Sequence, residues 1–225
     1  MSHAETESRF IAHPDKGEVS ALLIRPEGAR WLLVLGHGAS TNMRHRNLQA
    51  IAEHLADVGV ATFRYNHPYM ERGGGRDARA VTLATVHAAC EAAHAAAPDL
   101  QLLAGGPSFS GRMTSNAAAE KALSHVQGIV FFSFPLHPAK KPGTERADHL
   151  SDVTVPMLFL SGTRDDLAYL DLLEPVVTGL GDSASLHLVD TADHGFKILK
   201  RTRQSDEDVY AEMARVFVDW TSRLY

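Results

Sequence analysis

A serine flanked by glycines follows a short apolar stretch near the middle of the 225-residue chain. Residues 102–112 have the sequence LLAGGPSFSGR, with Ser108 at the centre. A nucleophilic serine at a strand-to-helix turn is held in a strained backbone conformation, and small neighbours let the strand and the helix approach closely. Gly106 takes the first glycine position of such a turn; Ser110, interpreted as a spacer facing the helix packing, takes the second, and Gly111 follows it. The pattern favours Ser108 as a nucleophile, with an ordinary Gly/Ser turn as the alternative.

A carboxylate and a histidine that could activate this serine stand in two later segments, each directly after an apolar stretch. Asp165 lies in the segment FLSGTRDD and His194 in the segment DTADHGF. One class of known catalytic triads has the chain order serine, acid, histidine, so the order favours Ser108, Asp165 and His194 as a catalytic triad. Asp166 directly precedes an apolar helical run and is interpreted as its cap, which leaves Asp165 as the acid. Asp193 is the alternative acid.

The loop after the apolar stretch 31–35 could stabilise a developing oxyanion. It has the sequence GHGAST. Oxyanion holes of this kind take one backbone N–H from an early strand-to-helix loop and one from the residue after the nucleophile. Ala39 and Phe109 are therefore the expected donors. The G-x-G pattern also occurs in dinucleotide sites, but Thr41 occupies the third glycine position and no other nucleotide-binding feature accompanies it.

The succession of apolar and amphipathic stretches predicts the scaffold that brings these segments together. Strands are expected at 18–24, 31–35, 60–65, 100–104, 128–132, 155–160 and 185–189, and helices at 48–58, 77–96, 109–123, 167–180 and 206–224. Strands separated by such helices predict an α/β fold with a doubly wound, mostly parallel sheet and helices on both faces. Sites in such sheets open at the carboxyl ends of strands, where all three segments fall. We expect one domain over residues 1–225.

The remaining loops near these strand ends predict the substrate pocket. The glycine run at 73–75 and the proline-containing loop at 135–148 are too short for a large cap domain, so a shallow, open pocket is expected. Its lining is predicted to be His37, Met43, His67, Tyr69, Phe134 and His137. The histidines show none of the spacings of metal sites, so no metal is expected.

Composition narrows the class of partner. The formal net charge of −5 argues against a nucleic-acid partner, and the basic cluster at residues 197–203 is interpreted as a solvated helix face. The single cysteine, Cys90, excludes an intrachain disulfide. The N-terminus has no apolar core typical of a signal peptide, and no apolar run approaches the length of a membrane span. The expectation is a cytoplasmic protein without a membrane partner.

Six segments in order resemble one family: HGASTNMRH, FRYNHPYME, GGPSFSGRM, SFPLHPAKKP, SGTRD and DHGFK. From about Trp31 to the C-terminus the chain is similar to the alpha/beta hydrolase family that includes bacterial dienelactone-hydrolase-like proteins and the testis-expressed-30 and KANSL3-like group. The resemblance implies the α/β-hydrolase fold, with Ser108 as the elbow serine, Asp165 as the acid and His194 as the base. The family usually has glycine at the positions of Ser40 and Ser110. A true dienelactone hydrolase has cysteine at the elbow, so the serine argues against that specific activity.

These features predict a serine hydrolase that cleaves a small ester or thioester through an acyl-enzyme. A small-molecule acyl substrate is the expected partner, and no cofactor is required. One alternative is a non-catalytic interaction protein that retains the fold. Another is a different reaction on the same triad, such as transacylation, peptide cleavage or perhydrolysis. The sequence makes no prediction of the oligomeric state.

Overall fold

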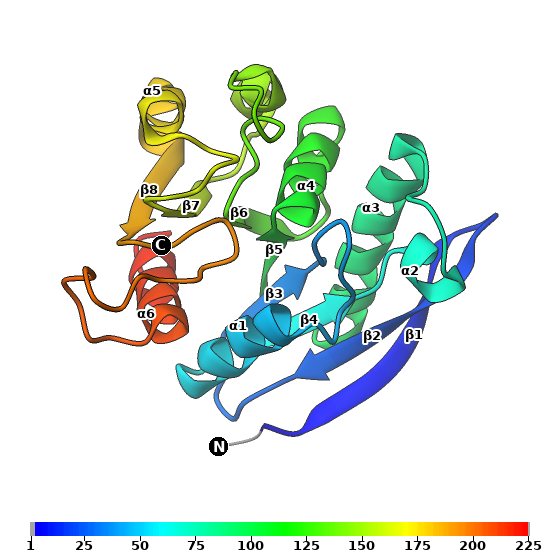
Figure 1. Ribbon diagram of the computed structural model, residues 1–225. Helices are drawn as coiled ribbons and strands as arrows, with labels where there is room; N and C mark the ends of the chain where they lie inside the picture. The colour runs from blue at the N-terminus through cyan, green and yellow to red at the C-terminus, as the bar shows by residue number, and fades with distance from the viewer. Residues whose placement is uncertain (1–2, 225) are drawn as a thin grey trace.

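Eight strands form one hydrogen-bonded sheet in the order β1-β2-β4-β3-β5-β6-β7-β8 (Figure 1). The structure is a computed structural model that describes residues 3–224, so residues 1, 2 and 225 of the expected domain lie outside the described residues. Strand pairs β3–β4, β3–β5, β5–β6, β6–β7 and β7–β8 are parallel. The pairs β1–β2 and β2–β4 are antiparallel. The expected mostly parallel sheet is confirmed.

Three consecutive strands begin the chain, and each later strand is separated from the next by one or two helices. The strands are β1 Glu5–His13, β2 Gly17–Ile24, β3 Trp31–Leu35, β4 Ala61–Tyr65, β5 Gln101–Pro107, β6 Val126–Phe132, β7 Met157–Gly162 and β8 Ala184–Val189. The helices are α1 Arg46–Asp57, α2 Pro68–Arg72, α3 Arg79–Ala96, α4 Phe109–Glu120, α5 Leu170–Gly179 and α6 Val209–Thr221. Two 3₁₀ helices, η1 Glu145–Asp152 and η2 Gly181–Ser183, complete the order.

The central strands are apolar on both faces because helices cover both sides of the sheet. In β3, Leu32 and Val34 pack into the core formed with α3 and α4, whereas Leu33 and Leu35 pack into the core formed with α1 and α6. Figure 1 shows α1 and α6 together on one side of the sheet and α3 and α4 on the other. Successive side chains of a strand point to opposite faces, so a continuous apolar run is what a doubly covered strand requires.

Two parts of the fold were not expected from the sequence. Strand β1 lies at the sheet edge, pairs with β2 and has mostly exposed residues, so no apolar alternation marks it. The short elements α2 and η1 lie in loops near the carboxyl ends of the strands. Helix α5 begins at Leu170, three residues later than the expected start at 167. The other expected helices are present with boundaries that differ by a few residues.

The carboxyl ends of the parallel strands carry short connections. Within residues 3–224 these connections hold α2, η1 and irregular loops, and none forms a large cap domain. In the described part of the chain, no helix has the length and apolar character needed to cross a membrane.

Candidate active site

Ser108 lies at a sharp turn between β5 and α4. Its φ of 51° and ψ of −111° are uncommon for a residue other than glycine. An ideal Cβ on Gly106 would lie 2.6 Å from the Gly36 carbonyl oxygen, and one on Gly111 would lie 2.5 Å from the Gly106 carbonyl oxygen. The absence of a side chain at Gly111 lets α4 approach β5, and its absence at Gly106 lets the turn approach the loop after β3. Gly111 thus provides the close approach that was expected at the second glycine position of the turn.

The side chains of Ser108, His194 and Asp165 lie in a hydrogen-bonded row. The Ser108 Oγ is 2.9 Å from His194 Nε2. His194 Nδ1 is 2.8 Å and 2.9 Å from the two carboxylate oxygens of Asp165. The Asp165 side chain is fully buried and that of His194 is 21% exposed, so the row runs from the interior toward solvent. The Asp165 carboxylate accepts a hydrogen bond from Nδ1–H, which leaves Nε2 as the acceptor for the serine hydroxyl.

The choice between Asp165 and Asp166 rests on a different interaction from the one expected. Asp166 is exposed and does not cap a helix, because α5 begins at Leu170 with Tyr169 as its N-terminal flanking residue. Instead, Asp165 Oδ1 accepts the backbone N–H of Leu167 at 2.8 Å. The turn after β7 therefore orients Asp165 toward His194, and the capping role assigned to Asp166 was wrong.

The histidine loop after β8 is held on both sides. Asp193 Oδ1 accepts the backbone N–H groups of Gly195 and Lys197, each at 2.9 Å, so this carboxylate shapes the loop and does not contact His194 through a hydrogen bond. Asn47 Nδ2 donates to the Gly195 carbonyl at 3.0 Å. An ideal Cβ on Gly162 would lie 2.3 Å from the Ala192 carbonyl oxygen. The absence of a side chain at Gly162 lets the acid turn and the histidine loop lie side by side.

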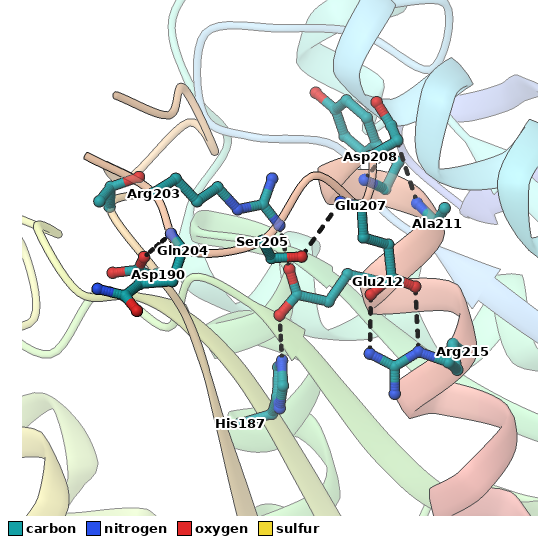
Figure 2. A network of polar contacts seen from close by, with 12 residues as sticks. His187, Asp190, Arg203, Gln204, Ser205, Glu207, Asp208, Ala211, Glu212 and Arg215 are labelled. Carbon is teal, nitrogen blue, oxygen red and sulfur yellow. Dashed lines mark hydrogen bonds and ion pairs between the residues drawn. The ribbon is translucent and has the colours of Figure 1, made fainter. Parts of the chain in front are cut away.

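The segment that follows the histidine loop is fixed against α6 by a polar network (Figure 2). Glu212 on α6 forms an ion pair with Arg203 and lies 2.8 Å from His187 Nε2 on β8. Asp190 Oδ2 accepts the backbone N–H of Gln204 at 3.1 Å. The expected helix at residues 197–203 is absent, and the Arg203 side chain is only 2% exposed, whereas Lys197, Lys200 and Arg201 are exposed as expected. The Glu212 carboxylate draws that guanidinium into the protein.

The loop after β3 is fixed by side chains from two other elements. Ser110 Oγ donates to the His37 carbonyl oxygen, and Tyr69 Oη donates to the Ala39 carbonyl oxygen at 2.9 Å. Within residues 3–224, the backbone N–H groups of Ala39 and Phe109 donate to no carbonyl or side chain. Free, oriented N–H groups beside a nucleophile are what an oxyanion hole requires. Ser110 faces this loop, not the helix packing.

The six residues expected to line an open pocket lie inside the protein. Each is at most 2% exposed: His37, Met43, His67, Tyr69, Phe134 and His137. They do not form a pocket rim, and the expectation was wrong on this point. The residues follow strand ends as expected, but the loops fold back over the sheet. His37, His67, Tyr69 and Phe109 instead form a cluster of ring contacts, with centroids 5.0 to 6.5 Å apart.

The buried histidines of this cluster are neutral at physiological pH. Burial lowers the pKa of His37 to about 4, against a smaller opposing effect of its hydrogen bond to the Gly38 carbonyl. Burial, and then the neighbouring His37, holds the pKa of His67 well below its usual value. His37 Nε2 accepts the backbone N–H of His67 at 3.0 Å. Because the Ser110 hydroxyl donates to the His37 carbonyl oxygen, His67 Nε2–H donates to Ser110 Oγ, at 3.0 Å.

We expect replacement of Ser110 by alanine to lower the free energy of unfolding by about 1–3 kcal/mol, because the His67 N–H loses its acceptor in a water-free environment. Denaturant unfolding monitored by circular dichroism measures the change. Ser222→Ala is the matched control: its hydroxyl, on the exposed C-terminal end of α6, also donates to a backbone carbonyl. An effect of Ser110→Ala no larger than that of the control would contradict the role assigned to this hydroxyl.

Three features of the candidate site could not be predicted or were not predicted from the sequence. The tertiary contacts of Tyr69 and Ser110 with the loop after β3 join residues distant in sequence, and no local pattern marks them. Arg112, in contrast, stands within the GGPSFSGRM segment one helical turn after the nucleophile. Its position so close to Ser108 could have marked Arg112 in the sequence as a candidate residue of the site. Among the described residues there is no group of three or more potential metal ligands.

Comparison with known proteins defines the family. A family model described as an alpha/beta hydrolase domain matches residues 29–222. This match spans most of the sequence, and the chain belongs to that alpha/beta hydrolase family. The resemblance to an alpha/beta hydrolase family that the sequence motifs indicated is confirmed.

Solved structures of other proteins are similar to this chain over nearly its whole length. Dienelactone hydrolase from Anabaena variabilis has 18% identity and a TM-score of 0.73, with 98% of this chain and 99% of that chain covered. XC6422 from Xanthomonas campestris, described as a serine hydrolase without a lid, has 18% identity and a TM-score of 0.72, with 99% and 96% covered. The esterase domain of a Rhodothermus marinus protein has 17% identity and a TM-score of 0.71, with 98% of each chain covered. These similarities show the α/β-hydrolase fold.

Proposed function

We propose that this protein hydrolyses a small ester or thioester through an acyl-enzyme formed on Ser108. The observation that carries the proposal is the hydrogen-bonded row of Ser108, His194 and Asp165, whose contacts are 2.8 to 2.9 Å long. The serine is presented at a strained turn, the acid is buried, and the histidine lies between them. Esterases and a dienelactone hydrolase among the structures with the same fold add support.

In the proposed mechanism, Ser108 Oγ attacks the carbonyl carbon while its proton passes to His194 Nε2. Asp165 holds the imidazole in the required orientation and stabilises the imidazolium. The backbone N–H groups of Ala39 and Phe109 bind the oxyanion of the tetrahedral intermediate. His194 then protonates the departing alcohol or thiol. Water attacks the acyl-enzyme by the same route in reverse, which releases the acid and restores the serine.

Covalent labelling with a fluorophosphonate probe tests the proposal directly, because labelling requires an activated hydroxyl. We expect stoichiometric labelling of Ser108, located by peptide mass spectrometry. A panel of p-nitrophenyl esters, acyl-coenzyme A thioesters and small lactones then separates ester from thioester hydrolysis.

Asp166→Asn serves as a matched control, since Asp166 is exposed and adjacent to the proposed acid. It should label at the wild-type rate. Folded protein that takes up no probe and hydrolyses none of these compounds would refute the proposal in favour of a non-catalytic protein that retains the fold.

A further inference from the structure

A cleft lined by three arginines lies at the start of the helix that follows the proposed nucleophile. It has a volume of about 340 Å³ and lies between the start of α3 and the first turns of α4. Arg76, Arg79 and Arg112 line it, together with Asp77 and Phe109. Phe109 directly follows Ser108, and the backbone N–H of Arg112 donates to the Ser108 carbonyl oxygen at 3.2 Å. One side of the cleft is therefore formed by the first turn of the helix that follows the proposed nucleophile.

Carboxylates do not neutralise this cleft. Arg79 forms an ion pair with Glu120, which does not line the cleft. Asp77, the carboxylate of the cleft, is itself committed to two other cations: its Oδ1 is 2.7 Å from Arg72 and 3.6 Å from Lys16 Nζ, and its side chain is 3% exposed.

The two remaining arginines of the cleft, Arg76 and Arg112, have no ion pair with any carboxylate in residues 3–224. The Arg112 Nε is buried and has no hydrogen-bond partner. Arg76 lies over the ring of Phe109, with its guanidinium carbon 5.7 Å from the ring centroid. Both guanidinium groups belong to residues that line the cleft, and neither is engaged by a carboxylate, so their charges can act on a ligand there.

Neighbouring groups show that the positive charges act on one another. Burial lowers the pKa of Arg112, and Arg146, Arg76 and Arg79 lower it further. Burial, followed by Arg112 and Arg79, lowers the pKa of His149 to about 4. Like charges brought this close destabilise the free protein, and an anion in the cleft relieves that repulsion. The excess of positive charge is confined to this part of the protein, since the whole chain has a net charge of −5.

We propose that this cleft binds a phosphate group of the substrate, so that the proposed hydrolase acts on small phosphorylated esters. This inference rests on the proposed function. Two arginines without carboxylate partners match a dianion better than a monocarboxylate, and guanidinium donors suit phosphate oxygens. Arg112 is one helical turn from Ser108, a rise of about 6 Å along the helix axis, so one small substrate could reach both the cleft and the nucleophile.

Matched esters test the preference. The kcat/KM of butyrylglycerol phosphate is compared with that of butyrylglycerol and of the butyryl ester of glyceric acid, which has a carboxylate in place of the phosphate. We expect the phosphorylated ester to be preferred by at least tenfold over both. Arg76→Gln and Arg112→Gln should each reduce the preference by roughly tenfold, the size of one lost charged hydrogen bond. Arg215→Gln on α6, which lies across the sheet, is the control and should retain it.

Binding without turnover separates this inference from the proposed function. The affinity of Ser108→Ala for phenyl phosphate, measured by calorimetry, should fall roughly tenfold when Arg76→Gln is added. Arg76 is exposed, so this variant tests the site even where Arg112→Gln fails to fold. Arginine-dependent phosphate binding by a protein that hydrolyses no ester would support the cleft and reject the proposed function. Hydrolysis with no phosphate preference, a preference for the carboxylate ester, or phosphate binding that survives in both arginine variants would overturn the phosphate assignment.

Discussion

Replacing Ser108 by alanine is expected to lower kcat for ester hydrolysis on the order of 10⁶-fold, the scale seen when a triad nucleophile is removed. The variant retains the proposed oxyanion donors and the proposed substrate cleft, but it has no nucleophile to form the proposed acyl-enzyme. Its fold should be unchanged, because the Ser108 side chain makes no capping hydrogen bond to α4. Steady-state kinetics with a p-nitrophenyl ester, together with an unfolding curve, measures both effects.

The wild-type protein treated with a fluorophosphonate provides the matching chemical control. Its residual rate should equal that of Ser108→Ala, since both lack a free nucleophile. A Ser108→Ala rate within tenfold of wild type would show that another group attacks the substrate.

Replacing Asp165 by asparagine is expected to lower kcat by up to roughly 10⁴-fold, because the His194 imidazole then loses its orienting carboxylate and the stabilisation of its protonated form. Asparagine has nearly the same shape, and its amide oxygen can still accept the Leu167 N–H that Asp165 accepts at 2.8 Å. The fold should therefore persist. Steady-state kinetics of the variant, with circular dichroism as a check of the fold, provides the measurement.

Asp166→Asn is the control for this substitution. Its exposed side chain does not contact His194 through a hydrogen bond, so its kcat should stay within roughly twofold of wild type. A large loss for Asp166→Asn with little loss for Asp165→Asn would reverse the proposed assignment of the acid.

The order of strands and helices could be predicted from local patterns. A run such as WLLVL in β3 is apolar at every position because helices cover both faces of the sheet, and this signal is present in the sequence itself. The polar edge strand β1 has no such signal, since most of its residues are exposed. The start of α5 was also misplaced, because the turn at Asp165 uses the backbone N–H of Leu167 before the helix begins.

The sequence by itself determined the fold class and the three candidate residues of the proposed triad, since each follows an apolar strand and parallel strands end at one edge of the sheet. Only the tertiary structure decided how their surroundings are arranged. The loop histidines His37 and His67 are as polar in sequence as residues that line a pocket, yet both are fully buried and neutral. Ser110 and Tyr69 contact the loop after β3 from other elements, where the two histidines are enclosed. Such contacts join residues far apart in the chain, so local sequence patterns do not predict them.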